Sequence, residues 1–159
     1  MAKLTQKMRD DYEEFLVEIP MLLEDLQELL KKSRHYKNVK VGFDDETLDR
    51  IESFYLAVLS GKEKIDVSQA RINRIIIAYF GEALIERAGG KWILNDAKGD
   101  PSFGTPVVID WSKNKDTVAF SPVERRELLI ENCKPFLREM ITYAVNKEKF
   151  EEDFFKEFK

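Results

Sequence analysis

The chain has 159 residues, of which 43% are hydrophobic, 11% aromatic and 35% charged, and its 30 acidic residues outnumber its 26 Lys and Arg. This length suits one domain with a self-supporting core, and the aromatic content excludes a disordered chain. A single Cys and a single His exclude an intrachain disulfide and a multi-histidine metal site. The net charge of −4 argues against non-specific DNA binding.

The N-terminus and the hydropathy of the chain predict a cytoplasmic protein that does not engage a membrane. Residues 1–15 lack the apolar segment of a signal peptide. No stretch approaches the roughly 18 consecutive apolar residues that a membrane-spanning helix needs. An unpaired Cys133 also fits a reducing compartment.

Helical periodicity dominates the first half of the chain. Apolar residues recur at steps of three and four over residues 5–33, 46–60 and 67–88, which predicts three helices. Pro20 should kink the first helix or open a second one. The apolar stripe of the first helix fits packing over the domain's own core, and a partner-binding helix is the alternative.

The connections between these helices carry few chemical signals. The basic stretch 31–40 lacks a glycine-rich phosphate loop and interleaved aromatic residues, so we expect a solvated connector. His35 lies in this stretch and is expected to be a surface histidine. Gly89-Gly90 should end the third helix through a left-handed cap.

The hydrophobic period then changes from helical to strand-like. Short apolar segments at 91–94, 106–111 and 117–120 are separated by a polar loop and a turn, which predicts an antiparallel meander of three strands. Ser121, followed by Pro122 and by Glu124, has the pattern of a helix N-terminus with a capping box.

The C-terminal part is again predicted to be helical. A helix over 122–145 should be kinked near Pro135, with Cys133 as a buried, inert thiol. A last helix places four phenylalanines on one side, either to close over the core or to dock a partner: Phe150, Phe154, Phe155 and Phe158. The chain is thus expected to be one helix-rich α+β domain over 1–159. Its parts would be N-terminal helices (5–88), a small three-stranded antiparallel sheet packed against helices (91–120) and C-terminal helices (122–158).

Motifs for common chemistries are missing from the sequence. There is no phosphate-binding loop, no dinucleotide fingerprint and no nucleophile elbow, and the single histidine rules out the zinc-protease motif. We therefore expect no cofactor, no metal and no enzymatic activity. A small enzyme that uses Glu82 and loop carboxylates is an alternative.

Seven residues are candidates for a binding site. Glu82 lies on an otherwise apolar helix, where a carboxylate needs partners. It could be an acid of a ligand site, or it could accept a hydrogen bond from the N–H of Trp92 and tie helix to sheet. The other candidates are an aromatic residue that could anchor an interface or could instead belong to the core, and exposed acids near strand ends that could face a basic partner: Trp111, Asp96, Asp100, Asp110 and Asp116.

The segment around Glu82 also carries a resemblance. The run Tyr79-Phe80-Gly81-Glu82, then Gly89-Gly90-Lys91-Trp92, then Gly104-Thr105-Pro106, resembles small bacterial domains with a Y-x-G-E pattern followed by G-G-x-W. Some of these domains resemble immunity proteins of polymorphic-toxin loci. The resemblance covers residues 70–125 and implies an α+β domain that binds another protein. It implies no catalytic residues.

These observations favour a non-enzymatic protein that binds a protein partner, with a toxin domain as the partner that the resemblance implies. Opposite charge on the two partners would speed their association. A homo-oligomeric structural protein that uses the N-terminal helix as its interface is the alternative.

Overall fold

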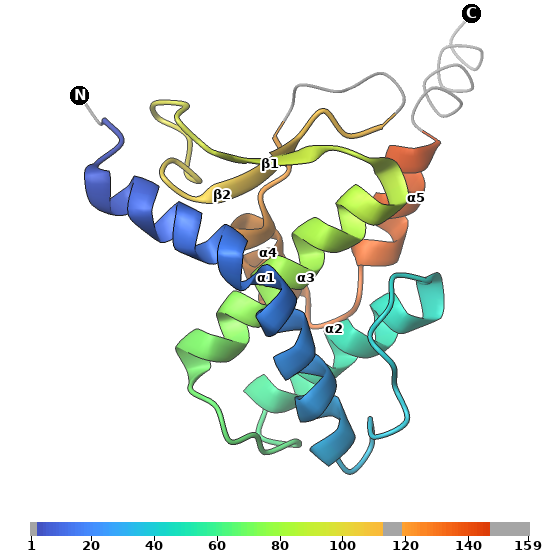
Figure 1. The fold of residues 1–159 in the computed structure, drawn as a ribbon. Helices are drawn as coiled ribbons and strands as arrows, with labels where there is room; N and C mark the ends of the chain where they lie inside the picture. Colours follow the sequence, from blue (N-terminus) through green and yellow to red (C-terminus); the bar gives the residue numbers. More distant parts are fainter. Residues whose placement is uncertain (1–2, 113–118, 147–159) are drawn as a thin grey trace, which may run out of the picture.

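The computed structural model describes residues 3–112 and 119–146. It is helix-rich, with one two-stranded antiparallel sheet between the third and fourth helices (Figure 1). The elements, in chain order, are α1 (Gln6–Lys32), α2 (Asp45–Leu59), α3 (Gln69–Ala88), β1 (Lys91–Leu94), β2 (Pro106–Ile109), α4 (Pro122–Asn132) and α5 (Leu137–Val145).

The long helix α1 begins and ends close to where the sequence predicts. Thr5 caps it, because its side-chain oxygen accepts a hydrogen bond from the N–H of Met8 at 3.1 Å. Pro20 lies inside the helix without splitting it. Figure 1 shows α1 bent about midway along its length, as expected for a proline that removes one backbone hydrogen bond.

The helix α3 is the centre of the fold. It packs against α1, α4, α5 and β2. Because neighbours cover it on several sides, its buried residues go round most of the helix rather than forming one stripe: Ile72, Ile75, Ile76, Ala78, Tyr79, Phe80, Gly81, Ala83 and Leu84. Gly89 ends it with a φ of 80° and a ψ of −173°, a conformation open to glycine but not the left-handed helical one that was predicted.

Within residues 3–112 and 119–146, the sheet has two strands, and the three strands predicted are not supported. β1 and β2 pair from Lys91 opposite Ile109 to Leu94 opposite Pro106. After Ile109 the chain turns through left-handed residues, with φ of 59° at Asp110 and 73° at Ser112, which ends β2. Phe120 then returns to pair with Val108 in a single bridge. The hairpin lies across one end of the helices in Figure 1.

The second half of the predicted helix 122–145 is a separate helix. α4 ends at Asn132, and Cys133 adopts a left-handed conformation with φ of 54°. Pro135 has no N–H and disfavours a helical residue before it, so the helix breaks rather than kinks. The prediction of a buried Cys133 is wrong, because this break leaves the thiol exposed.

Some predictions concern residues outside the described ranges. Asp116, the first half of the predicted third strand and the four phenylalanines of the predicted last helix belong to this group. Among residues 3–112 and 119–146, no helix is long and apolar enough to cross a membrane.

Candidate functional site

Glu82 and Trp92 are joined by a hydrogen bond between α3 and β1. The indole N–H of Trp92 donates to Oε1 of Glu82 at 3.0 Å. This is the bond that the sequence suggested as one of two roles for Glu82. The carboxylate therefore has a structural partner that ties the hairpin to the central helix.

The glycines of the resemblance motif make room for this contact. The Trp92 ring lies directly over Gly81, so that a Cβ at residue 81 would overlap the ring. A Cβ at Gly90 would lie 2.7 Å from the carbonyl oxygen of Ile109. The Trp92 ring also meets Phe15 of α1 in a T-shaped contact, with 5.2 Å between ring centroids. These motif residues therefore hold α1, α3 and the hairpin together.

The structure buries Trp111 and separates the acids near the strands. Trp111 is 7% exposed and belongs to the hydrophobic core. Asp96 and Asp100 lie in the loop beyond the β1–β2 end at Leu94, whereas Asp110 follows the opposite end of the hairpin. These acids do not form one cluster.

Two of these acids also have partners. Asp100 accepts a hydrogen bond from the N–H of Ser102 at 2.8 Å, and Asp110 pairs with Lys91 at 3.7 Å. Asp96 is exposed. Within the described residues, no group of three or more His, Cys, Asp and Glu side chains is arranged to hold a metal ion.

His35 is exposed, as predicted, but it has a partner that its spacing along the chain does not reveal. Its Nδ1 lies 2.9 Å from Oε1 of Glu63, whose side chain is only 6% exposed. The hydrogen bond from the His35 side chain is the main reason that the pKa of Glu63 is below its ordinary value. This pair holds the stretch between α1 and α2 against the loop between α2 and α3.

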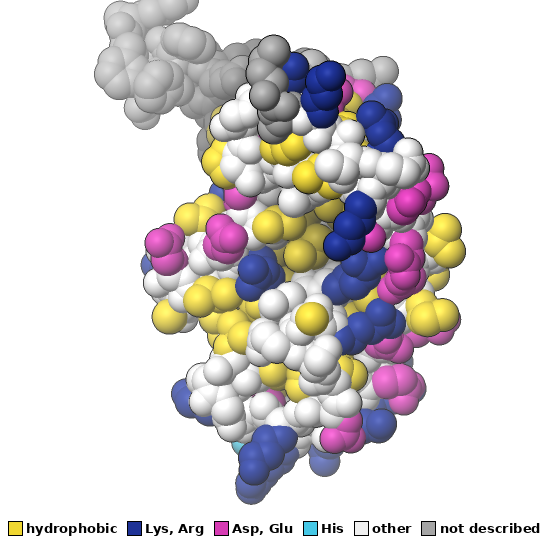
Figure 2. Space-filling model, turned by 90° about the vertical axis from the view of Figure 1, so that its left-hand side faces the viewer, with side chains coloured by type: hydrophobic (Ala, Val, Ile, Leu, Met, Phe, Trp, Pro, Cys, Tyr) yellow, Lys and Arg dark blue, Asp and Glu magenta, His cyan; other side chains and the backbone are white. Residues whose placement is uncertain are grey.

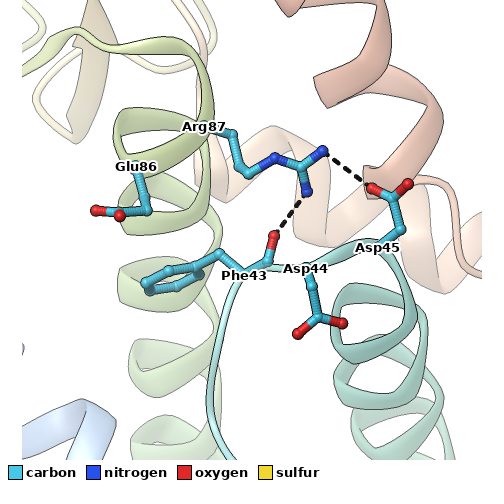
Figure 3. Close-up of a pocket in the computed structure, with 5 residues that line it drawn as sticks. All are labelled: Phe43, Asp44, Asp45, Glu86 and Arg87. Carbon is cyan, nitrogen blue, oxygen red and sulfur yellow. Dashed lines mark hydrogen bonds and ion pairs between the residues drawn. The ribbon is translucent and has the colours of Figure 1, made fainter.

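A charged hollow of about 540 Å³ lies where α2 begins and α3 ends (Figure 3). Arg87 donates to the carbonyl oxygen of Phe43 at 2.7 Å and pairs with Asp45 at 3.0 Å. Asp44 caps α2 by accepting from the N–H of Thr47 at 3.0 Å. Figure 3 shows Glu86 pointing away from Arg87. The charges here do not converge on a common point, so this hollow fits a structural joint better than a ligand site.

A more apolar groove of about 480 Å³ lies between α1, α3 and the residues that lead into β2. Phe15 and Ile77 line it together with Arg74, whose guanidinium lies 5.3 Å from the centre of the Phe15 ring. Gly104 of the resemblance motif lies at its edge, where a Cβ would be 2.9 Å from the sulfur of Met8. Figure 2 shows hydrophobic side chains gathered in the middle of this face, beside a row of Lys and Arg.

The outer side of α1 is the most distinctive surface, and none of its residues is among the seven predicted for a binding site. Val17 is 80% exposed and Met21 is 57% exposed, one helical turn apart. Exposed acids at steps of three and four surround this pair: Asp10, Glu13, Glu14, Glu24 and Glu28. These seven residues are called the acidic face below. Figure 2 shows acidic side chains along one edge of the molecule, with hydrophobic side chains among them.

The charge of this segment is strongly one-sided. Residues 10–30 contain eight acids and no Lys, Arg or His. Since the whole chain carries −4, the remaining residues carry a net charge of +4. The sequence indicates this surface by a stretch of 21 residues that contains no basic residue. The net charge of the whole chain does not show it, because the other residues are basic on balance.

Two of the eight acids are neutralised on the inner side of α1. Arg71 of α3 pairs with Glu18 at 3.0 Å and with Asp25 at 2.7 Å. Burial raises the pKa of Glu18, but the hydrogen bond from Arg71 and the charge of Arg74 outweigh this, so its pKa is lowered. These ion pairs hold α1 on α3 and leave the acids of the acidic face turned toward solvent.

The acidic face, with its two exposed apolar side chains, can thus bind a surface that is basic and partly apolar. Comparisons of the chain with protein-family profiles, with curated proteins and with solved structures find no match.

Proposed function

We propose that the protein is a non-enzymatic, cytoplasmic protein-binding domain and that the acidic face of α1 binds a basic partner. The observation that carries the proposal is the exposed pair Val17 and Met21 at the centre of that face. Large apolar side chains this exposed, ringed by charges, are typical of interaction surfaces.

The charges of the acidic face select a basic partner and attract it over a distance. A stretch with eight acids and no base raises the local concentration of a basic partner and speeds association, most strongly at low ionic strength. The apolar pair adds short-range affinity once the surfaces meet, because central desolvated side chains carry most of the binding energy of an interface.

The same charges argue against the homo-oligomeric alternative through this helix. In a two-fold dimer the same patch meets itself, so two acidic faces would repel each other. The enzyme alternative loses support for a different reason, because Glu82 already accepts the Trp92 N–H at 3.0 Å.

The finer form of the proposal is an immunity-like role, in which the partner is a toxin domain with a basic cleft. It is supported by the resemblance over residues 70–125 and by the acidic face, which lies outside that segment. A nuclease cleft is basic because it binds phosphates, and an acidic helix would block it by charge and by volume.

The test compares charge reversal on the acidic face with the same reversal elsewhere. E13K/E24K changes two exposed acids that flank Val17 and Met21, and E127K/E131K changes two exposed acids of α4 as the matched control. Each variant captures partners from the native cell, and mass spectrometry quantifies them. We expect a stoichiometric basic protein whose recovery falls about tenfold or more with E13K/E24K only.

A partner that E13K/E24K retains at the wild-type level would contradict the use of this face. Recovery of no stoichiometric partner by the wild-type chain would contradict the binding function itself. Binding of the purified partner should also weaken with added salt.

A further inference from the structure

Glu52 of α2 and the first turn of α5 form a contact that the proposed function does not use. Glu52 is 0% exposed, although it carries a carboxyl group. Its Oε1 accepts a hydrogen bond from the backbone N–H of Leu137 at 3.0 Å, and its Oε2 accepts one from that of Phe136 at 3.1 Å. We propose that this contact is a pH-sensitive latch, in which the protonation of Glu52 sets how tightly α5 is held on α2.

The start of α5 depends on Glu52 because the chain supplies no cap of its own there. The first N–H groups of a helix have no partner inside the helix. Phe136 is the N-cap residue of α5, and its side chain makes no capping hydrogen bond. Glu52 takes the place of the cap from another helix, so that loosening this contact exposes two backbone N–H groups as well as one carboxyl group.

The other contacts of α5 are of two kinds. Arg138 pairs with Asp45 at 3.5 Å and with Asp49 at 3.2 Å, on side chains 36–48% exposed, where ion pairs add little stability. Leu137, Ile141 and Ala144 are buried. An open α5 would expose these apolar residues and the part of α3 beneath them.

The surroundings of Glu52 place its titration near neutral pH. Burial raises its pKa to about 7, the hydrogen bonds from Phe136 and Leu137 oppose this, and the charge of Asp49 raises the pKa further. From α3, Tyr79 faces the same region, and its pKa is raised by burial and then by the charges of Asp44 and Glu52. Tyr79 therefore stays neutral while Glu52 titrates.

The direction of the effect follows from the two states of α5. With α5 open, Glu52 is in water and has its ordinary pKa of 4.5, so the docked state binds the proton more tightly. Docking is then strongest below pH 4.5, weakens as the pH rises toward about 7 and levels off above that. The difference between the two pKa values corresponds to a roughly 300-fold larger open population at high pH than at low pH.

Amide hydrogen exchange along α5 tests the latch. The opening equilibrium is measured between about pH 5 and 8, after correction for the intrinsic base-catalysed exchange rate. In the wild-type chain, most of the increase in the opening equilibrium constant of α5 falls between these pH values. We expect this constant to increase by more than about tenfold. E52Q keeps the size of the side chain without its charge and should make opening independent of pH. E46Q, at an exposed position of the same helix, should keep the wild-type dependence.

The latch is overturned if E52Q retains the wild-type pH dependence, or if opening in the wild-type chain is constant over this range. Should E52Q fail to fold, the carboxyl carbon resonance of Glu52 in the wild-type chain decides the question. A midpoint near pH 7 supports the latch, and a midpoint near 4.5 overturns it.

Discussion

Gly81 shows how one missing side chain fixes the relation between the central helix and the hairpin. The Trp92 ring occupies the place that a Cβ at residue 81 would take. Since Trp92 also meets Phe15 at 5.2 Å and donates to Glu82 at 3.0 Å, the ring has little room to move away.

We therefore expect Gly81→Ala to destabilise the protein although alanine favours helices. Overpacking typically costs about 1–3 kcal/mol, and the gain in helix propensity recovers at most about 1 kcal/mol. Gly42→Ala is the control, because the nearest atom to its Cβ would be 3.7 Å away. Urea unfolding of both variants measures the difference. Equal stabilities for the two would contradict the packing argument.

At the scale of residues, the hydrogen-bond partner of a side chain could be predicted only where a charged residue interrupts an apolar helix face. Glu82 on an apolar helix demanded a donor, and Trp92 supplies it. The position of Glu52 carries a comparable signal. It is an acid between Leu48 and Tyr55 on the buried side of α2, where a carboxylate also needs a donor. The contact of His35 with Glu63 joins residues 28 apart, and no local pattern encodes such a distance.

Among the elements, the starts of α1, α2, α3 and α4 were predicted to within two residues, because short polar N-cap residues mark them in the sequence. Thr5, Asp44, Ser68 and Ser121 each accept a hydrogen bond from an N–H of the helix that follows. The second strand, in contrast, was predicted to continue to Trp111, whereas β2 ends at Ile109. Left-handed residues at 110 and 112 end β2 early, and a period-two pattern does not reveal such a turn.

Removing the cap of the central helix should lower stability by a measurable amount. In Ser68→Ala the N–H of Arg71 loses its acceptor, which lies 3.1 Å away, and a lost N-cap typically costs about 1 kcal/mol. Ser60→Ala at the C-terminal end of α2 is the matched control and should change stability by less than about 0.5 kcal/mol. Thermal unfolding compares the two, and a larger loss in Ser60→Ala would contradict this reading of α3.

At the scale of the whole molecule, charge is divided between α1 and the rest of the chain. Residues 10–30 carry eight acids and no base, while the remainder carries +4. Asp96 and Asp100 lie near one end of the hairpin and Asp110 follows the other, so these three acids do not share one surface. The acids that do share a surface come from one continuous helix.

This division predicts that the purified protein is monomeric at low ionic strength. Screening is weak there, so that like-charged faces of α1 repel over about 10 Å or more. Sedimentation velocity at low and at high salt measures the state of association. A stable dimer of the wild-type chain at low salt would contradict the prediction, and a dimer that survives E13K/E24K would place the interface elsewhere.

The break between α4 and α5 has a practical consequence. Cys133 is the single cysteine of the chain, and its thiol is exposed at the start of the segment that leads into α5. A maleimide dye or a nitroxide would therefore attach at one known position of the unmodified sequence. Paired with a second label on α2, such a probe would follow the distance between the two helices as the pH is changed.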